Sequence, residues 1–334
     1  MSRLGVAVIG LGRMGAPYAR VLSQLPNAKL AAVCDIDAEL TRRVAAEMGV
    51  PGYADYREML AAAKDIQAVC VCTSDQAHRE PCVRAAKAGK HILLEKPLAT
   101  TIEDGEAIIA AARGAGVKLM VAHLLRFDPR YARAWQTVRE GRIGEPIHVF
   151  ARRNNILASG RRIGGRTSVL YFLGIHDIDF LLWCLEDKPT SVYATASRKL
   201  LTDLGVDDTI FALIRFAGGS VACIEASWVL PDTSFAILDA RLEIVGTQGA
   251  VYVDINGQGL TMIDAARAER VDTVYSPVLH GEVQGALRDE IEHFVTCALT
   301  GREPLITGEE ALKSVRVVAA AHRSLESGRA EAIE

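Results

Sequence analysis

The first 122 residues repeat one pattern, in which short apolar runs alternate with amphipathic segments of helical period. The strand candidates are LGVAVI, KLAAVC, AVCVC, HILL and VKLMVA. Apolar strands separated by helices need crossover connections, so the pattern predicts a parallel sheet covered by helices on both faces. Capping signals support the segmentation, because Asp37 can begin one helix and Thr100 followed by Glu103 can begin another.

A different pattern begins near residue 123. Two hairpins are predicted after the strand EPIHVFARRN, one turning at 217–220 and one at 246–249, and helices over 282–298 and 309–325 end the chain. We therefore expect an α/β protein of two domains. Residues 1–122 form a doubly wound parallel sheet, and residues 123–334 form an α/β domain with a large, mostly antiparallel open sheet, whose last helix can pack back on the first domain.

Composition limits the class of partner. A chain of 334 residues is longer than a single hydrophobic core usually organises, which favours two domains. Its net charge of -3 offers no general attraction for nucleic acid or an anionic membrane. We find no apolar run of membrane-spanning length and no secretion signal. Seven cysteines without paired spacing suggest neither disulfides nor a metal site. We expect a cytoplasmic protein with a small-molecule partner.

The stretch GLGRMG, residues 10–15, follows the first strand and opens the first helix. Its glycines suit a tight turn, close approach of a pyrophosphate and close helix packing, and Asp35 stands where a carboxylate can bind a ribose diol. An ordinary glycine-rich bend and a strand-ending Asp35 are the weaker alternative, because three contexts agree. Since Ile36 and Asp37 follow instead of a basic residue, we predict NAD rather than NADP. The predicted cofactor residues here are Gly10, Leu11, Gly12, Arg13, Met14, Gly15, Asp35 and Ile36.

Two further segments carry candidates for chemistry. Lys96 in LLEKPLA stands at the carboxyl end of a parallel strand, where it can donate to a substrate oxygen, although a surface Glu-Lys pair explains it as well. SVLYFLGIHDIDFLLWC, residues 168–184, is apolar yet contains His176, Asp177 and Asp179. In a helix, Asp179 can orient the His176 imidazole, and Asp177 can be a first-turn carboxylate; a packed core histidine is the alternative.

Together, GLGRMG, the T-x-x-x-x-H of TSDQAH, GKHILLEKPLA, RFDPRYARA and GIHDID resemble the Gfo/Idh/MocA family of glucose-fructose oxidoreductase, inositol dehydrogenase and rhizopine catabolism proteins. The resemblance implies a Rossmann domain, a second domain with an open sheet, and NAD(P)-linked oxidation or reduction of sugars and cyclitols. It also implies that Lys96 and His176 are catalytic. The cofactor residues that it adds are Thr73, Ser74, His78, Glu95 and Lys96.

One position departs from the family pattern. Many of these dehydrogenases have an aspartate four residues before the histidine, but here that position is Phe172, preceded by Tyr171. Either Lys96 and His176 suffice, with Asp179 or Tyr171 assisting, or the activity differs from simple dehydrogenation. In the preferred mechanism, neutral His176 takes the alcohol proton, Lys96 hydrogen-bonds the developing oxyanion, and NAD accepts the hydride.

The segment ARRNNILASGRRIGGR, residues 151–166, contains five arginines and no acid. It predicts a flexible, glycine-containing loop that closes on an anionic substrate group, or equally a solvated or subunit-contacting loop. Arg126 is a further candidate for the crevice wall. The predicted substrate-binding residues are Lys96, Arg126, Arg153, Arg166, Tyr171, Phe172 and His176.

The leading functional hypothesis is an NAD-dependent dehydrogenase that acts on a secondary alcohol of a sugar, sugar nucleotide or inositol-like cyclitol, either neutral or anionic. Two alternatives stay open: a glycosidase or epimerase that oxidises its substrate transiently, and a catalytically silent NAD-binding regulator. We also predict a homodimer or homotetramer formed through the open face of the second sheet, because an uncovered sheet face needs cover.

Overall fold

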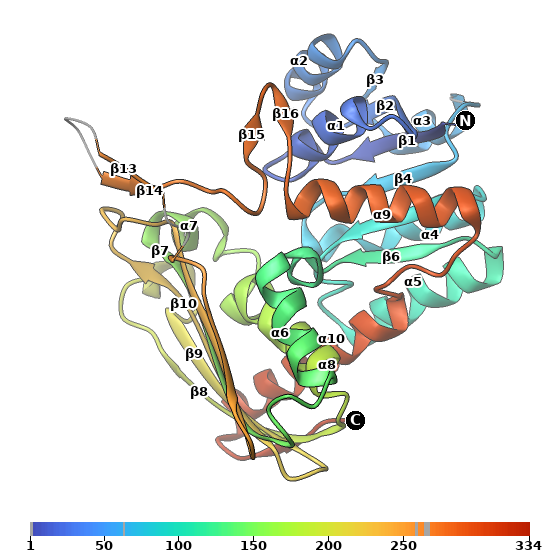
Figure 1. The fold of residues 1–334 in the computed structure, drawn as a ribbon. Helices are drawn as coiled ribbons and strands as arrows, with labels where there is room; N and C mark the ends of the chain where they lie inside the picture. Colours follow the sequence, from blue (N-terminus) through green and yellow to red (C-terminus); the bar gives the residue numbers. More distant parts are fainter. Residues whose placement is uncertain (1–2, 63, 258–259, 264–267) are drawn as a thin grey trace. The chain divides into compact units, whose positions relative to one another are not determined.

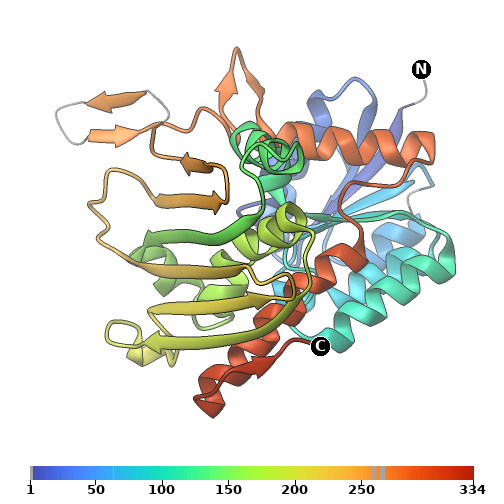
Figure 2. The same cartoon turned by 60° about the horizontal axis from the view of Figure 1, so that its bottom comes forward.

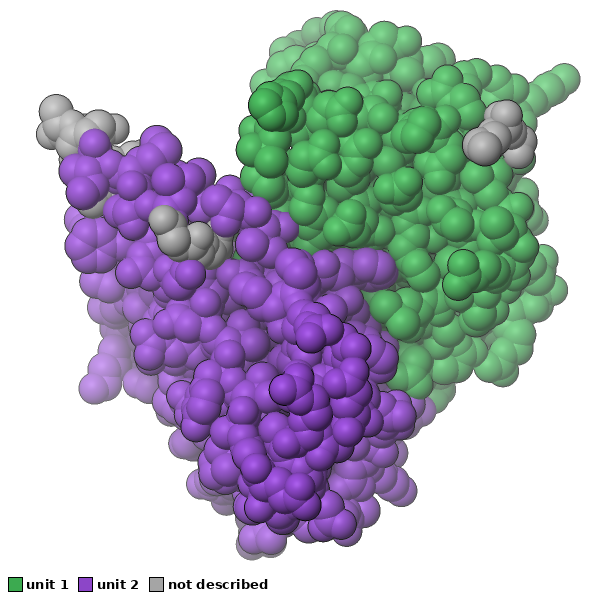
Figure 3. Space-filling model, in the orientation of Figure 1, with its two compact units in different colours: residues 1–124, 275–312 green, residues 125–274, 313–334 purple. Residues whose placement is uncertain are grey.

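The computed structural model describes residues 3–62, 64–257, 260–263 and 268–334 (Figure 1). The chain forms two compact units, which Figure 3 shows in different colours. Unit 1 contains residues 1–124 and 275–312, and unit 2 contains residues 125–274 and 313–334. This division differs from the boundary read from the sequence, because residues 275–312 pack with the first unit. Helix α9 (Ala286–Thr300) in this segment contacts β1, β5 and α1.

Unit 1 is built on a six-stranded parallel sheet with the order β3-β2-β1-β4-β5-β6. Its strands are β1 (Leu4–Ile9), β2 (Ala28–Cys34), β3 (Gly52–Tyr53), β4 (Ala68–Val71), β5 (His91–Glu95) and β6 (Leu119–Ala122). Its helices include α1 (Gly15–Gln24), α2 (Ala38–Met48), α3 (Tyr56–Ala62), α4 (Arg79–Lys87) and α5 (Ile102–Ala115), with a 3-10 turn at Asp75–Ala77. The strand order reverses between β1 and β4, the point at which doubly wound sheets bind their ligands.

The five predicted strands of unit 1 are confirmed, and so is the cap of α2 by Asp37, which accepts from two backbone amides. The two-residue strand β3 and helix α3 were missed, because neither is long enough to show a period. The predicted cap at Thr100 and Glu103 was wrong by one residue. The Thr101 hydroxyl accepts from the Asp104 amide at 3.1 Å, so α5 begins one residue later.

Unit 2 contains a seven-stranded sheet with the order β12-β11-β7-β10-β9-β8-β17. Its strands are β7 (Pro146–Ile156), β8 (Pro189–Ser197), β9 (Thr209–Phe216), β10 (Val221–Leu230), β11 (Leu238–Gly246), β12 (Ala250–Asp254) and β17 (Glu331–Ala332). Strands β7 and β10 pair in parallel and the other pairs are antiparallel, which confirms the mostly antiparallel sheet and both predicted hairpins.

The remaining elements are mostly helices and short hairpins. The turn η2 (Leu124–Phe127) crosses from unit 1 into unit 2. Unit 2 also contains α6 (Pro129–Arg139), α7 (Leu157–Ile163), a π-helix (Leu170–Gly174), α8 (Ile175–Leu185), η4 (Thr202–Leu204), β13 (Thr261–Ile263) and β14 (Ala268–Arg270). Helix α10 (Gly308–Ser327) begins in unit 1 and ends in unit 2, and β15 (Val278–Leu279) and β16 (Glu282–Val283) belong to unit 1. Within the described ranges, no helix is both long and apolar enough to cross a membrane.

One face of the seven-stranded sheet carries the core of unit 2. Helices α6 and α8 lie on that face (Figure 1), and Figure 2 shows the strands from another direction. Residues alternate accordingly along β9, where Ile210, Ala212 and Ile214 are buried while Phe211 and Leu213 are exposed. The second face is therefore the one that leaves large apolar side chains accessible.

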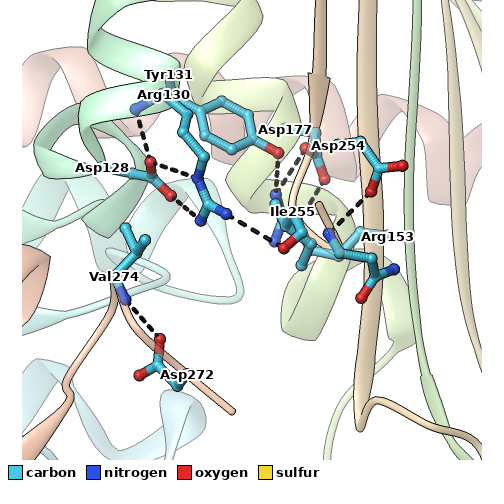
Figure 4. Close-up of polar contacts among 10 residues, drawn as sticks. Asp128, Arg130, Tyr131, Arg153, Asp177, Asp254, Ile255, Asp272 and Val274 are labelled. Carbon is cyan, nitrogen blue, oxygen red and sulfur yellow. Dashed lines mark hydrogen bonds and ion pairs between the residues drawn. The ribbon is translucent and has the colours of Figure 1, made fainter. Parts of the chain in front are cut away.

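The apolar segment around His176 carries two carboxylates because both are paired with buried arginines. Helix α8 places Asp177 and Asp179 in the core, each with 1% of its surface exposed. The Nε and Nη2 of Arg153 donate to the two Asp177 oxygens at 2.7 and 2.9 Å (Figure 4). The same atoms of Arg126 donate to Asp179 at 2.9 and 2.8 Å. Such bidentate geometry offsets much of the desolvation penalty of both charges.

Removing one charge of a buried pair should be far more costly than removing one charge of an exposed pair. Asp177→Asn leaves the Arg153 guanidinium charged in the core without its carboxylate. We expect the free energy of unfolding of unit 2 to fall by about 3–5 kcal/mol. As a matched control, Asp203→Asn disrupts the exposed pair of Arg161 and Asp203, at 3.2 Å, and should change it by less than about 1 kcal/mol.

Urea unfolding followed by tryptophan fluorescence measures this difference. All three tryptophans, Trp135, Trp183 and Trp228, lie in unit 2, so the signal reports that unit. Equal losses in the two variants would contradict the role that we give to the buried pair.

Candidate functional site

The glycine turn after β1 has a conformation that larger residues cannot adopt. Gly10 has φ of +87°, and a Cβ there would lie 2.6 Å from the Cys72 carbonyl oxygen. At Gly15 a Cβ would lie 1.7 Å from the Gly10 carbonyl oxygen. The backbone of the turn therefore packs directly against β4 and against the start of α1.

The middle of the same turn is open. Gly12 is exposed, and nothing lies within 4 Å of the position that its Cβ would take. Arg13 beside it is exposed and Met14 is half-buried. The first amides of α1 follow directly, and a helix N-terminus attracts anions. The turn thus offers a cradle of the kind that a dinucleotide pyrophosphate occupies.

Asp35 joins the end of β2 to the glycine turn. Its Oδ2 accepts from the Leu11 amide at 2.6 Å, and its Oδ1 accepts from the Asp37 amide at 2.9 Å. A carboxylate oxygen has a second lone pair, so Asp35 keeps acceptor capacity for a ribose diol. Ile36 next to it is 95% exposed, an unusual degree for an isoleucine and suited to contact with an apolar ligand surface.

His78 braces two loops at the same edge of the sheet. Its Nδ1 lies 2.8 Å from the Pro97 carbonyl oxygen and its Nε2 lies 3.3 Å from the Thr73 carbonyl oxygen. Burial lowers the pKa of His78, so the neutral ring donates to one of these carbonyls. Thr73 is half-buried and Ser74 is exposed. Contact of these three residues with the cofactor stays a prediction.

Lys96 follows β5 directly and is half-buried, and its peptide bond to Pro97 is cis. Glu95 points into the interior of unit 1, where its Oε1 accepts from the Tyr18 hydroxyl at 2.9 Å. Its Oε2 accepts from the Lys96 amide at 3.1 Å. Burial raises the pKa of the Glu95 carboxyl above its ordinary value, which the nearby Lys96 charge and the Tyr18 hydrogen bond partly offset. Glu95 therefore fixes the backbone of Lys96 through this hydrogen bond.

The predicted residues of unit 1 share one edge of the sheet. Gly10, Asp35, Thr73 and Lys96 all stand beyond the carboxyl ends of parallel strands, namely β1, β2, β4 and β5. This is the edge at which open parallel sheets bind ligands. The structure thus brings the glycine turn, the candidate ribose carboxylate and the candidate catalytic ammonium together.

In unit 2, His176 is half-buried in the first turn of α8. Asp179 lies three residues on, as predicted, but both of its oxygens accept from Arg126. The expected hydrogen bond to the imidazole is therefore not the main interaction of Asp179. Asp177, expected to interact only with the helix dipole, instead pairs with Arg153.

The residues before His176 pack against aromatic rings. The Tyr171 ring stacks on the His322 ring, with centroids 5.6 Å apart, and the Phe172 ring lies 6.2 Å from that of Trp228. The His322 Nε2 also lies 2.9 Å from the Ser168 hydroxyl, and burial lowers the pKa of His322. Position 172 thus offers an apolar surface where many relatives are expected to carry a carboxylate.

The prediction of a flexible loop over 151–166 was wrong. Residues 151–156 are the end of β7 and residues 157–163 are helix α7. Gly160 and Gly164 are buried, and a Cβ at Gly160 would lie 3.0 Å from the Trp228 carbonyl oxygen. These glycines permit close packing instead of motion. Arg166 is exposed beyond the helix.

Acids from distant parts of the chain pair with most of the arginines that we expected to face a substrate. Arg153 and Arg126 hold Asp177 and Asp179, and Arg153 also donates to the Tyr131 hydroxyl at 3.1 Å. Their contact with a substrate stays a prediction. Sequence reasoning missed these partners, and it missed Tyr18, Glu290 and His322 as well, because spacing along one chain gives no signal for contacts between distant elements.

Comparison with known proteins agrees with this arrangement. A family model described as "Oxidoreductase family, NAD-binding Rossmann fold" matches residues 4–123, and one described as "GFO/IDH/MocA C-terminal domain" matches residues 131–252. An inositol 2-dehydrogenase of Rhizobium meliloti is 30% identical over 96% of this chain and 97% of its own. A scyllo-inositol 2-dehydrogenase (NAD(+)) of Bacillus subtilis is 28% identical over 96% of this chain and 94% of its own.

A solved structure also resembles this chain over its whole length. The crystal structure of GenD2 from gentamicin A biosynthesis, in complex with NAD, has a TM-score of 0.85 and 26% identity, and the match covers 100% of this chain and 97% of that one. The glycine cradle, the carboxylate at the end of β2 and the two matching domain models lead to one conclusion: the chain belongs to the Gfo/Idh/MocA family of oxidoreductases, with an NAD-binding Rossmann fold as its first domain.

Proposed function

We propose that this oxidoreductase transfers hydride between a secondary alcohol of an uncharged cyclitol, of the inositol class, and the nicotinamide of NAD. Relatives named as inositol dehydrogenases match almost the whole chain, which supports oxidation or reduction of CH-OH groups in sugars or cyclitols. The observation that carries the proposal is the position of Lys96, which is half-buried at the same sheet edge as the glycine cradle.

The proposed chemistry divides between two side chains. When bound, NAD supplies the hydride acceptor. His176, as a neutral imidazole, removes the hydroxyl proton, because a base that titrates near neutral pH is efficient in this role. Lys96 donates a hydrogen bond to the same oxygen as negative charge develops on it, which stabilises the transition state more than the ground state. Position 172 contributes no proton acceptor in this scheme.

The charge balance of unit 2 favours an uncharged substrate. Arg126 and Arg153 are each bound bidentately to a buried aspartate, so little of their charge or donor capacity is left for an anionic group. Arg152 and Arg161 pair with Asp239 and Asp203. A phosphate or diphosphate that approached any of these four arginines would have to compete with a carboxylate that already binds it.

A substrate panel tests the proposal. Myo-inositol, scyllo-inositol, glucose, glucuronate and UDP-glucose are each incubated with the protein and NAD, and the absorbance of reduced nicotinamide is followed. We expect NADH to accumulate fastest with an inositol. Turnover without net NADH would instead favour the transient-oxidation alternative, and activity confined to UDP-glucose or glucuronate would contradict an uncharged substrate.

Loss of the Lys96 ammonium should affect the chemical step and leave cofactor binding intact. We expect Lys96→Met to lower kcat/KM by about 10²–10⁴-fold, because it removes the donor to the developing oxyanion, with little change in the dissociation constant for NAD. His176→Asn should cause a loss in the same range. The matched control is Lys87→Met, which makes the same change at the exposed end of α4 and should leave kcat/KM unaltered.

Steady-state kinetics and NAD titration by calorimetry separate these effects. A Lys96→Met enzyme with wild-type kcat/KM would exclude Lys96 from catalysis. A loss of NAD binding equal to the loss of kcat/KM would show that Lys96 serves the cofactor instead.

Two glycines of the cradle should respond differently to the same substitution. Gly12→Ala adds a methyl group that meets no protein atom but stands where the pyrophosphate approaches. We expect NAD to bind at least about tenfold more weakly, with an unchanged melting temperature. Gly15→Ala places a methyl group against the Gly10 carbonyl and should lower the melting temperature by several degrees. Unimpaired NAD binding by Gly12→Ala would contradict the cradle.

The outer face of the seven-stranded sheet supports the predicted oligomer. Strand pairing aligns Tyr193, Leu213, Cys223 and Phe150 across β8, β9, β10 and β7 in one row. Tyr193 and Leu213 are 42% and 54% exposed, which is costly for side chains of this size on a sheet surface. We propose that a second copy of the chain covers this row through a two-fold contact.

A charge at the centre of the row should prevent that contact. We expect Leu213→Asp to convert the oligomer to monomers, because it would bury two unpaired carboxylates at a two-fold interface. The control is Ile263→Asp. Ile263 is 79% exposed and lies on β13, outside the seven-stranded sheet, so this change should leave the oligomer intact. Sedimentation velocity gives the masses. A wild-type protein that sediments as a monomer would exclude the contact.

A further inference from the structure

Three buried side chains of unit 1 meet beneath Lys96 and are not used by the proposed mechanism. Tyr18 comes from α1, Glu95 ends β5, and Glu290 comes from α9. Tyr18 is 0% exposed, Glu95 8% and Glu290 1%. The Tyr18 hydroxyl oxygen lies 2.9 Å from Glu95 Oε1 and 3.3 Å from Glu290 Oε2. One hydroxyl thus stands at hydrogen-bonding distance from two carboxyl groups.

The number of protons on Tyr18, Glu95 and Glu290 decides whether both of these hydrogen bonds can form. A phenol has one proton to donate, and its oxygen can accept another. If both carboxyl groups were ionised, one of them would face the lone pairs of the Tyr18 oxygen inside a buried site. If one carboxyl is protonated, it donates to Tyr18 while Tyr18 donates to the other. The second arrangement satisfies both contacts.

Glu95 is the better site for the negative charge. Burial raises the pKa of its carboxyl, but its Oε2 accepts from the Lys96 amide, and the nearby Lys96 charge favours the ionised form and partly offsets that rise. Burial and the neighbouring Glu95 and Glu290 raise the pKa of Tyr18 well above its ordinary value, so the phenol keeps its proton. Burial also raises the pKa of the Cys70 and Cys72 thiols, so both keep their protons beside these acids.

We propose that Glu290 is protonated in the folded enzyme and donates to Tyr18, which donates to ionised Glu95, so that this chain holds Lys96 in place as a charged donor. Tyr18, Glu95 and Glu290 act through Lys96 and are positioning residues. These three side chains exchange no proton with the substrate during turnover, because Glu290 and Tyr18 keep their protons throughout. The inference rests on the proposed catalytic role of Lys96.

Infrared difference spectroscopy of the ligand-free protein at neutral pH tests the protonation states directly. The wild-type spectrum minus that of Glu290→Gln should show the carbonyl band of a protonated carboxylic acid. The wild-type spectrum minus that of Glu95→Gln should show carboxylate bands only. Glu292→Gln, on the same helix but half-exposed, is the matched control and should also show carboxylate bands. Carboxylate bands from Glu290, or an acid band from Glu95, would overturn the proposal.

The pH profile of kcat/KM with an inositol provides a second readout. Tyr18→Phe removes the donor to ionised Glu95 and raises the pKa of that carboxyl. Protonation of Glu95 should then add to protonation of His176, so that the acid limb becomes steeper and begins at higher pH than in the wild type. Glu290→Gln keeps a donor to Tyr18, since its amide replaces the acid, and should move that limb less. An unshifted limb in Tyr18→Phe would contradict the link from Tyr18 to Lys96.

These readouts separate the inference from the proposed function. If Glu290 shows the band of a protonated acid but the protein oxidises no polyol, the proposed function is wrong and the proposed hydrogen-bonded protons at Tyr18 and Glu290 stand. An active dehydrogenase without that band would sink the chain alone.

Discussion

Unit 1 depends on a backbone contact between β1, α1 and the end of β4 that only glycine permits. A side chain at Gly15 would overlap the Gly10 carbonyl, and one at Gly10 would overlap that of Cys72. The contact lies where the strand order reverses, so it brings the ends of adjacent strands to one edge. Asp35 adds β2 to this edge through the Leu11 amide. The cofactor site is thus a direct consequence of close backbone packing.

Unit 2 is organised by charge instead. Two buried arginines hold the two carboxylates of α8, and such pairs add little stability compared with apolar residues of the same size. Their bidentate geometry does, however, restrict rotation of the helix. We therefore attribute to Arg126 and Arg153 the orientation of α8, in which half-buried His176 precedes two neutralised acids.

The sequence predicted features that local patterns encode. The strands of unit 1, the glycine turn and Asp35 all follow from residues close together in the chain. Contacts between distant residues could not be predicted. Arg126 and Asp179 are 53 positions apart, and the sequence around either residue does not indicate its partner. The loop error has a different cause. Glycine permits motion and also permits close packing, and Gly160 serves the second purpose against Trp228.

The same charge balance explains why Phe172 fits this chain. A carboxylate at position 172 would be a third negative charge on one short segment, beside Asp177 and Asp179, whose two arginines are already fully engaged. It would also replace the ring contact with Trp228 by a charge facing an aromatic surface. Phenylalanine avoids both costs. In the proposed mechanism, His176 is then the acceptor for the proton of the substrate hydroxyl, and no acid at position 172 is needed.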